Sequence, residues 1–364
     1  MMRIFVVVGT RPEAIKMAPL YKCLRETAGM DARLISTGQH RQMLDQVFDW
    51  FDLKPDADLG LMKPNQTLAS VISGGVAGLD DLIVREKPDV VLAQGDTTTV
   101  MAAALASFSR EVPFGHVEAG LRTYSLNQPF PEEGFRQMTS RVTTYHFAPT
   151  ERAAQCLRDE RVGGHIHMVG NTVIDALLQT AASKAYLPEA LVLSRPRMVL
   201  ITGHRRENIG QRFKDAFGAI ATLASRFPDA DFVYPVHLNP NVRDVALEIL
   251  SGLENVHLIA PVPYPEMVAL QQRATLILTD SGGIQEEAPT FRVPVLVMRD
   301  HTERQEAVEA GAAKLVGAEP ERIVSEVSNL LQNEDARRKM MVDRNPFGDG
   351  HASERIRDLL LAAV

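Results

Sequence analysis

Residues 276–287 read Leu-Ile-Leu-Thr-Asp-Ser-Gly-Gly-Ile-Gln-Glu-Glu and combine residue types that can hold a phosphate group. An apolar run is followed by the small residues Ser281, Gly282 and Gly283 and then by a helical pattern, which predicts a strand, a tight turn and a helix N-terminus. Unpaired N–H groups and the helix dipole attract anions there, and glycines let a diphosphate approach the backbone. Glu287, about one turn further on, could reach a ribose hydroxyl of a nucleotide. An ordinary βα turn is the alternative explanation.

A second set of candidate phosphate ligands follows the first apolar run. Residues 9–13 read Gly-Thr-Arg-Pro-Glu, and the proline suits the first turn of a helix. Arg11 is then left at the carboxyl end of a strand, and Lys16 follows about one turn later. Because arginine forms a planar fork that matches phosphate, we predict phosphate binding here, with a surface arginine as the alternative. Neither G-x-G-x-x-G after a strand nor a P-loop pattern is present, so no nicotinamide cofactor is predicted.

Three carboxylates stand where predicted strands end or helices begin. Asp96 lies in Gln-Gly-Asp-Thr-Thr-Thr, Glu118 in His-Val-Glu-Ala-Gly-Leu-Arg, and Glu132 follows Pro-Phe-Pro at the start of a helical pattern. Helix capping and compensation of the helix dipole are the alternative roles. Three such groups facing one cleft are candidate acids and bases, since apolar surroundings and mutual repulsion separate their pKa values.

Cationic residues follow two strands of the second half of the chain. His204 and Arg205 lie in Gly-His-Arg-Arg-Glu-Asn, where a cluster of cations requires a negative partner, either a diphosphate or nearby carboxylates. Arg304 lies in a loop after a later strand, and His237 follows another strand end. No histidine spacing is typical of a metal site, so no metal is predicted.

Composition restricts the class of protein. A chain of 364 residues exceeds the usual size of one core and predicts two domains. The net charge of −7 argues against a nucleic-acid partner, which needs a basic surface. Cys23 and Cys156 lie in helical patterns, and we predict that both are reduced. Neither a membrane span nor a signal peptide is apparent, and a cytoplasmic location is expected.

Apolar runs alternate with amphipathic segments along the whole chain. The pattern predicts an α/β protein with two doubly wound, Rossmann-like parallel sheets and a cleft between them, where the carboxyl ends of the strands should lie. The predicted domains are residues 1–182, residues 183–350, and a C-terminal helix, residues 351–364, that packs back on the first domain. The predicted strands are residues 4–8, 33–36, 90–93, 114–117, 146–148, 166–169, 198–201, 231–234, 256–259, 275–278 and 294–297.

Taken together, these motifs closely resemble those of the non-hydrolysing bacterial UDP-N-acetylglucosamine 2-epimerases. The resemblance covers nearly the whole chain and includes residues 9–14, 94–99, 116–122, 129–133, 203–208, 280–287 and 345–350. It implies the two-domain GT-B fold, with UDP held mainly by the C-terminal domain, and a homodimer whose interface the sequence does not locate. One loop departs from the family pattern, because His301 replaces a threonine and Gln305 replaces a proline beside Arg304.

The resemblance assigns roles to the candidate residues. The carboxylates Asp96, Glu118 and Glu132 lie around the sugar, and their division into acid and base stays open. We also include His204 among the catalytic residues. The predicted UDP-binding residues are Arg11, Lys16, His204, Ser281, Gly282, Gly283, Glu287 and Arg304.

The chemistry implied by the resemblance is epimerisation at C2 of UDP-N-acetylglucosamine. The family route eliminates UDP to give 2-acetamidoglucal and then adds UDP back, without a metal or other cofactor. Three alternatives remain: a GT-B glycosyltransferase, a hydrolysing epimerase that releases N-acetylmannosamine, and a catalytically silent nucleotide-sugar sensor. A modified UDP-sugar also remains a possible substrate.

Several bacterial members of the family bind a second UDP-N-acetylglucosamine that activates the enzyme. The matching positions here are Gln39, Gln42, Arg205 or its neighbour, and His237, together with Glu132. Asn65 stands where the regulated members have arginine, so we expect that this effector binds weakly. A structural role for the matching residues is the alternative.

Overall fold

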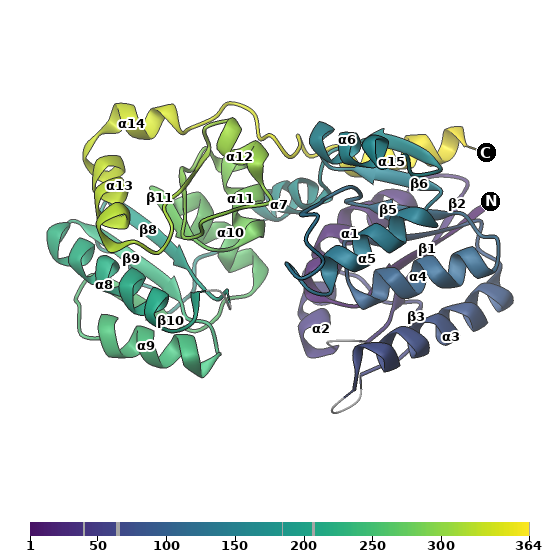
Figure 1. Ribbon diagram of the computed structural model, residues 1–364. Helices are drawn as coiled ribbons and strands as arrows, with labels where there is room; N and C mark the ends of the chain where they lie inside the picture. The colour runs from purple at the N-terminus through teal and green to yellow at the C-terminus, as the bar shows by residue number, and fades with distance from the viewer. Residues whose placement is uncertain (39–40, 63–65, 184, 206–207, 364) are drawn as a thin grey trace. The chain divides into compact units, whose positions relative to one another are not determined.

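The computed structural model describes residues 1–38, 41–62, 66–183, 185–205 and 208–363 (Figure 1). These residues form two compact units. The first comprises Met1–Gln179 and Phe347–Val364, and the second comprises Thr180–Pro346. Each unit contains one parallel sheet with helices, which confirms the predicted α/β class with two doubly wound domains.

The first unit has a seven-stranded sheet in the order β3-β2-β1-β4-β5-β6-β7. Its central strands are continuous apolar runs because helices cover both faces, and β1 is fully buried from Ile4 to Val8. The strands are β1 (Met2–Val8), β2 (Met30–Ser36), β3 (Ala57–Asp58), β4 (Val90–Gln94), β5 (Phe114–Val117), β6 (Tyr145–Ala148) and β7 (His165–Met168). The helices are α1 (Arg11–Arg25), α2 (Arg41–Trp50), α3 (Leu68–Glu86), α4 (Thr98–Ser109), α5 (Glu132–Arg141), α6 (Glu151–Asp159), α7 (Thr172–Ala182) and α15 (Ala352–Ala362).

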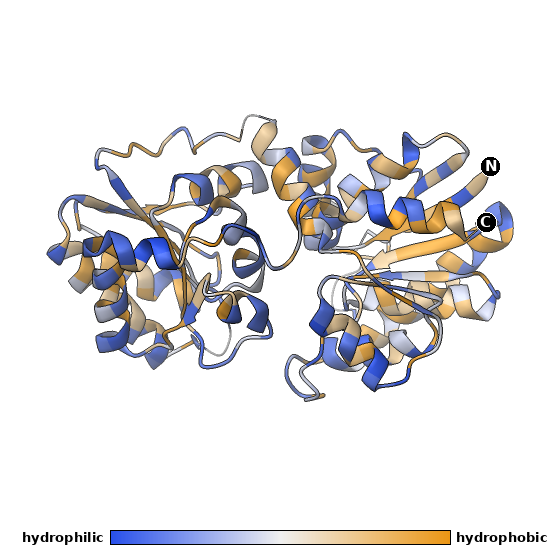
Figure 2. Cartoon of the chain, turned by 90° about the horizontal axis from the view of Figure 1, so that it is seen from above, coloured by the Kyte–Doolittle hydropathy of each residue, from blue (hydrophilic) through white to orange (hydrophobic). Residues whose placement is uncertain are grey.

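The second unit has a six-stranded sheet in the order β10-β9-β8-β11-β12-β13. Aromatic side chains from α8 and β9 fill one side of its core: Phe213 stacks on Phe217, and Tyr234 packs against Phe217 at a tilt. Hydrophobic segments lie inside the unit in Figure 2. The strands are β8 (Arg197–Thr202), β9 (Ala230–Pro235), β10 (Val256–Ile259), β11 (Leu276–Thr279), β12 (Val295–Val297) and β13 (Ala313–Leu315). The helices are α8 (Gln211–Arg226), α9 (Pro240–Leu250), α10 (Tyr264–Arg273), α11 (Gly282–Glu287), α12 (Gln305–Glu309), α13 (Pro320–Gln332) and α14 (Glu334–Lys339), with a 3₁₀ helix at Ala288–Phe291.

Two short strands, β3 and β13, were not predicted, whereas every other strand overlaps a predicted run. Neither short strand contains a continuous apolar run, and each exists because a neighbouring strand offers hydrogen-bonding groups. Helix α11 begins at Gly282, two residues before the predicted start, so both glycines belong to its first turn.

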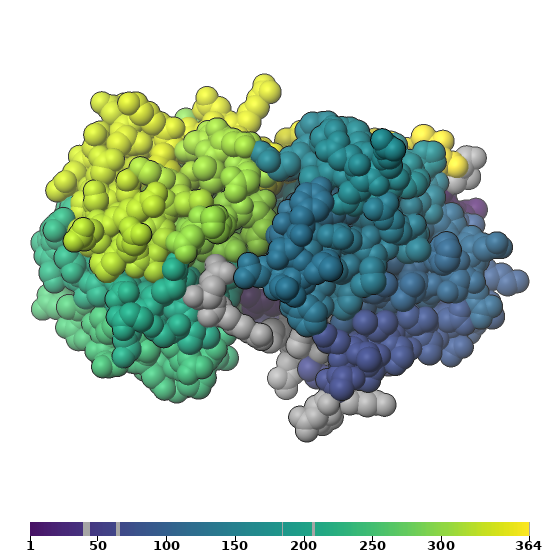
Figure 3. Space-filling view, in the orientation of Figure 1, coloured from purple at the N-terminus to yellow at the C-terminus, as the bar shows by residue number. Residues whose placement is uncertain are grey.

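The C-terminal helix α15 packs against α1 of the first unit (Figure 1), and the yellow atoms of the chain's end lie beside that unit in Figure 3. Asp175 accepts a hydrogen bond from the N–H of Ser353 at 2.8 Å, and Arg355 donates to the carbonyl of Val169 at 3.0 Å. The return to the first unit occurs at residue 347, where the predicted boundary was residue 350.

In each sheet the chain order reverses direction once, between β1 and β4 in the first unit and between β8 and β11 in the second. In open parallel sheets, ligands bind beyond the carboxyl ends of the strands at such a reversal. The loops after these four strands carry Arg11, Asp96, His204 and Ser281. Among the helices of the described ranges, none combines the length and apolar character needed to cross a membrane.

Candidate functional site

Glu118 is the most constrained carboxylate of the first unit. It follows β5 with a φ of 64°, a left-handed conformation that is costly for a residue with a Cβ and that clusters at functional sites. Its side chain is 5 % exposed and accepts a hydrogen bond from Lys16 Nζ at 2.7 Å. Gln94 and Asn171 also donate to it, the latter at 3.2 Å. The carboxylate is therefore held in one position at the carboxyl edge of the sheet.

Asp96 lies at the same edge, after β4. Its Oδ2 accepts a hydrogen bond from Arg136 Nε at 2.8 Å, and Arg136 also donates to Glu133 at 3.0 Å. Glu133 is fully buried and accepts two backbone N–H groups from residues 123 and 124. Since the Arg136 side chain is 7 % exposed, this buried chain of ionic hydrogen bonds fixes the Asp96 carboxylate.

Within the described residues, Glu132 and Arg11 form no ion pair, unlike Glu118 and Asp96. The Oε2 atom of Glu132 is buried and, within the part of the chain that the structure describes, has no hydrogen-bond partner. Arg11, at the start of α1, is half-buried and makes no ion pair with another described residue. Burial lowers the pKa of Arg11, although its guanidinium stays charged in water. Both groups therefore keep hydrogen-bonding capacity that the described residues do not use.

Asp280 organises the corresponding edge of the second unit. This buried carboxylate accepts hydrogen bonds from the backbone N–H of His204 and Arg205 and from the side-chain amide of Asn208, at 2.9–3.1 Å. The His204 ring stacks on His237 with 5.6 Å between centroids. Partial removal from water lowers the pKa of His204. The neighbouring His237 also lowers this pKa, whereas the charge of Asp280 raises it. The neutral imidazole of His204 is consequently favoured near pH 7.

The two glycines of the turn in the second unit have different surroundings. A Cβ at Gly282 would lie 3.0 Å from Cζ of Arg304, so the absence of a side chain lets this guanidinium pack on the turn. At Gly283 a Cβ would meet nothing closer than Ser281 Oγ at 3.9 Å, which leaves the backbone open to a ligand. Arg304 itself pairs with Glu286 at 2.9 Å and with Glu303 at 3.5 Å.

Glu287 ends helix α11 and is 6 % exposed. It accepts a hydrogen bond from the amide of Gln271 at 2.6 Å and one from the hydroxyl of Tyr264 at 3.4 Å, both from α10. These contacts orient a buried carboxylate beside the glycine turn. Its predicted role toward a ribose stays a prediction.

The predicted effector residues are described only in part. Gln39 and Asn65 lie outside the described residues, as does Arg206, and the side chain of Gln42 in α2 is likewise outside them. Of the remaining positions, the Arg205 backbone binds Asp280 and His237 stacks on His204.

Several residues that shape the site were not singled out by the sequence. They are Glu13, His116, Arg136, Asn171, Gln271 and Asp280. The sequence pattern did not reveal most of them because they act through contacts with residues distant in sequence. Glu13 did have a local signal, since Thr10 and Glu13 form a capping box at the start of α1.

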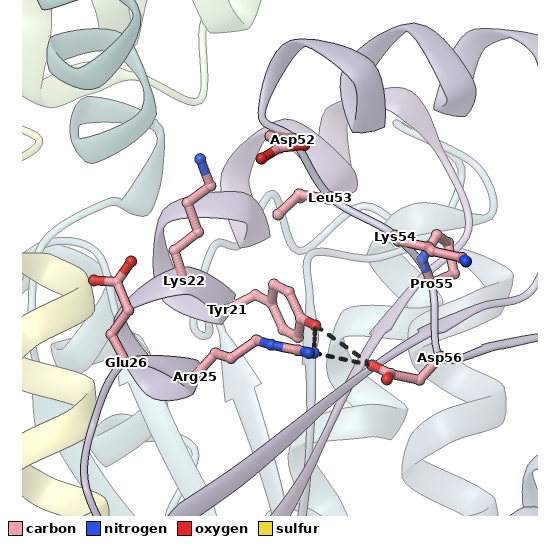
Figure 4. A pocket seen from close by; sticks show the side chains of 9 residues that line it. All are labelled: Tyr21, Lys22, Arg25, Glu26, Asp52, Leu53, Lys54, Pro55 and Asp56. Carbon is pink, nitrogen blue, oxygen red and sulfur yellow. Dashed lines mark hydrogen bonds and ion pairs between the residues drawn. The ribbon is translucent and has the colours of Figure 1, made fainter.

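A pocket of about 690 Å³ in the first unit is a separate feature (Figure 4). It lies at the amino edge of the sheet, between the end of α1 and the residues that precede β3. Its charges are mixed, and Arg25 contacts the Tyr21 hydroxyl at 2.5 Å and Asp56 at 3.8 Å. Its position away from the strand carboxyl ends excludes it from the candidate site. Within the described residues, no group of His, Cys, Asp and Glu side chains could hold a metal ion.

Comparisons with known proteins reveal sequences and structures that are similar over nearly the whole chain. The family model described as UDP-N-acetylglucosamine 2-epimerase matches residues 22–361. UDP-N-acetylglucosamine 2-epimerase of Escherichia coli strain K12 is 48% identical over 369 residues, covering 99% of this chain and 98% of the relative. The crystal structure of UDP-GlcNAc 2-epimerase from Neisseria meningitidis bound to UDP-GlcNAc superposes with a TM-score of 0.93 at 45% identity, over 99% of this chain and all of that one. The glycosyltransferase SnogD from Streptomyces nogalater shares the fold at a TM-score of 0.59 and 17% identity, over 100% of this chain and 99% of SnogD.

Proposed function

Because the chain belongs to the UDP-N-acetylglucosamine 2-epimerase family, we propose that it interconverts UDP-N-acetylglucosamine and UDP-N-acetylmannosamine without net hydrolysis. The observation that carries the proposal is the set of carboxylates at the carboxyl edge of the first sheet. Glu118 and Asp96 are held by buried cations, while Glu132 keeps an oxygen without a partner among the described residues. The product UDP-N-acetylmannosamine would serve as a precursor of a cell-surface polysaccharide. The enzyme would act as a cytoplasmic homodimer.

The proposed chemistry is elimination followed by re-addition. A carboxylate removes the proton from C2, the C1–O bond breaks with its electron pair leaving on UDP, and a C1–C2 double bond forms. UDP then adds back to C1 while a proton is delivered to the opposite face of C2. The C2 proton has no neighbouring carbonyl group, so the departing diphosphate has to be stabilised for elimination to proceed.

The second unit offers the groups for that stabilisation. The turn at Ser281–Gly283, the neutral His204 ring and the open backbone of Gly283 suit a diphosphate, and Glu287 suits the ribose. Arg11 of the first unit adds a positive charge. Arg304 and Lys16 already pair with carboxylates, so their predicted contacts with UDP require sharing those partners.

Epimerisation in heavy water tests the proposal. Incubation of UDP-N-acetylglucosamine with the protein should give UDP-N-acetylmannosamine with deuterium at C2, in buffer without added metal or nicotinamide, as followed by ¹H NMR. A parallel incubation in ordinary water controls for the label. Product that keeps its original C2 hydrogen would exclude proton removal, release of free N-acetylmannosamine would indicate hydrolysis, and a new glycosidic bond would indicate a glycosyltransferase.

We further propose that the activating site for a second UDP-N-acetylglucosamine persists but binds this effector weakly, through Gln39, Gln42, Arg205 or its neighbour, and His237, together with Glu132. Asn65 provides no positive charge for its diphosphate. A charged hydrogen bond contributes about 1.5–3 kcal/mol, so its absence should weaken the effector about tenfold or more.

The reverse reaction tests this regulation. Pure UDP-N-acetylmannosamine should react after a lag that a trace of UDP-N-acetylglucosamine abolishes, and Asn65→Arg should lower the activator concentration required. Initial rates from pure UDP-N-acetylmannosamine, measured by coupled detection of product, decide the matter. A full initial rate without activator, unchanged on its addition, contradicts the proposal.

A further inference from the structure

Glu13 is a buried carboxylate that accepts hydrogen bonds from two loops of the first unit. It lies in the first turn of α1 and is 2 % exposed. Its Oε2 accepts the backbone N–H of Gly9 at 2.6 Å and that of Thr10 at 2.9 Å. Its Oε1 accepts a hydrogen bond from the hydroxyl of Thr97, in the loop between β4 and α4. One side chain thus joins the loops that follow two adjacent strands.

We propose that Glu13 is a positioning residue that holds the Asp96 loop in register with the Arg11 loop. The inference rests on the proposed function, in which Asp96 acts on the sugar and Arg11 on the diphosphate. Both residues follow strands at the reversal of chain order, and one molecule of substrate would need both at a fixed separation. Glu13 is not itself placed in contact with substrate.

A capping box alone does not account for this arrangement. In a capping box the glutamate accepts the backbone N–H of the N-cap residue, and no contact with a second loop is required. Here the second carboxyl oxygen turns away from α1 to Thr97. The Thr97 hydroxyl in turn accepts the N–H of Thr99 at 3.2 Å and caps α4, which leaves its own proton for Glu13. The hydroxyl therefore caps α4 with its lone pairs and joins the two loops with its proton.

The loop that Glu13 holds is also fixed from two other elements. His116 of β5 is fully buried, and its Nε2 donates to the carbonyl of Gly95 at 2.7 Å. Burial lowers the pKa of His116 to about 3, so the ring is neutral with its proton on Nε2. Arg136 of α5 holds the Asp96 carboxylate. Glu13 differs from both because it also binds the backbone of residues 9 and 10.

Electrostatics gives the carboxylate a second effect on Asp96. Burial raises the pKa of Glu13 to about 7, its three hydrogen bonds oppose that rise, and the charge of Asp96 adds to it. The two carboxylates therefore repel each other. Glutamine removes this repulsion, and its oxygen can still accept from residues 9 and 10. Its amide nitrogen then faces Thr97, whose two lone pairs already accept the N–H groups of Thr99 and Val100, so the link to Thr97 is weakened.

Four variants test the hydrogen bonds by which Glu13 joins the two loops. Glu13→Ala removes both links and should lower kcat about 10²-fold and raise KM, since a displacement near 1 Å costs about that factor in rate. Thr97→Val removes the link to the Asp96 loop and the cap of α4 but leaves the contacts of Glu13 with residues 9 and 10, so kcat should fall while KM is unchanged. Thr97→Ser retains the link and the cap and should keep most of kcat. Glu13→Gln keeps the contacts with residues 9 and 10 but weakens the link to Thr97, so its kcat should fall although α4 stays capped. Steady-state kinetics with UDP-N-acetylglucosamine measures all four.

A matched control and a structural measurement make the test independent of overall stability. Asp231 is a buried carboxylate at the amino edge of the second sheet that also accepts two backbone N–H groups, from Ser194 and Arg195. Asp231→Ala should lower the thermal midpoint as Glu13→Ala does, with kcat retained below that midpoint. Hydrogen–deuterium exchange over residues 95–100 should quicken in Glu13→Ala, in which Thr97 can still cap α4, and in Thr97→Val, and should stay as in the wild type in Thr97→Ser.

Each outcome bears on the inference. Wild-type kcat and KM in Thr97→Val, or equal losses of kcat in Glu13→Ala and Asp231→Ala, would overturn it. If Glu13→Ala does not fold, Thr97→Val and Thr97→Ser still decide. A wild-type protein that does not convert UDP-N-acetylglucosamine refutes the proposed function instead, and exchange rates over residues 95–100 then still report whether Glu13 joins the loops.

Discussion

Glu132→Gln, Glu118→Gln and Asp96→Asn are each expected to lower kcat by about 10² to 10⁴, because each removes a group that can take or give a proton. UDP binding should weaken far less, since these carboxylates act on the sugar in the proposed reaction. The measurements are steady-state kinetics in both directions and UDP titration by calorimetry. Near-normal turnover in all three variants would refute the catalytic assignment.

The ion pairs divide these variants into two classes. Glu118→Gln removes the negative charge beside Lys16, and Asp96→Asn removes one of the two carboxylates that pair with Arg136, which keeps Glu133; both cations are largely buried. Removing the charged partner from a buried ion pair is destabilising, so the thermal midpoint should fall along with kcat. Glu132 has no ion pair within the described ranges, and Glu132→Gln should lower kcat at unchanged stability. It is therefore the cleanest test of chemistry, with the exposed Glu151→Gln as control.

Asp280→Ala is expected to cause the largest loss of stability and of UDP affinity. It leaves the N–H of His204, the N–H of Arg205 and the amide of Asn208 without their acceptor. An unsatisfied buried donor costs about 1–3 kcal/mol. The Asn208 amide is buried and the two backbone N–H groups are part-buried, so the free energy of unfolding should fall by about 1–3 kcal/mol. The loop that carries His204 would lose its anchor, and UDP should bind more weakly as a consequence.

Urea unfolding and UDP calorimetry measure these two effects. The unfolding free energy and UDP affinity of Asp280→Asn should lie between those of the wild type and Asp280→Ala. Its side-chain carbonyl oxygen can accept a hydrogen bond, but its amide group faces other donors. Asp300→Ala serves as control, because Asp300 is 60 % exposed and its ion pair with Arg212 contributes about 1 kcal/mol at most. Unchanged UDP affinity in Asp280→Ala would show that this loop has no part in nucleotide binding.

The sequence by itself determined the fold class and most of the elements. A buried strand in a parallel sheet is an apolar run, and a covering helix is an amphipathic segment. Both can therefore be predicted from the pattern of residues that are adjacent in sequence. The strand-end positions of Asp96, Glu118, His204 and Ser281 were predictable for the same reason. Strands β3 and β13 were not, because their two or three residues are held by pairing with β2 and β12 rather than by their own composition.

The tertiary structure alone decided which charged groups meet. Lys16 was predicted to bind phosphate, yet it lies 2.7 Å from Glu118, which is 102 residues away in sequence. Asp280 anchors a loop 76 residues earlier, and Arg136 reaches Asp96 across 40 residues. Local sequence specifies that a residue stands at a strand end, whereas strand order in the sheet brings two such ends together. The pairs of charged groups are therefore known only from the structure, which places β1 beside β4 and β8 beside β11.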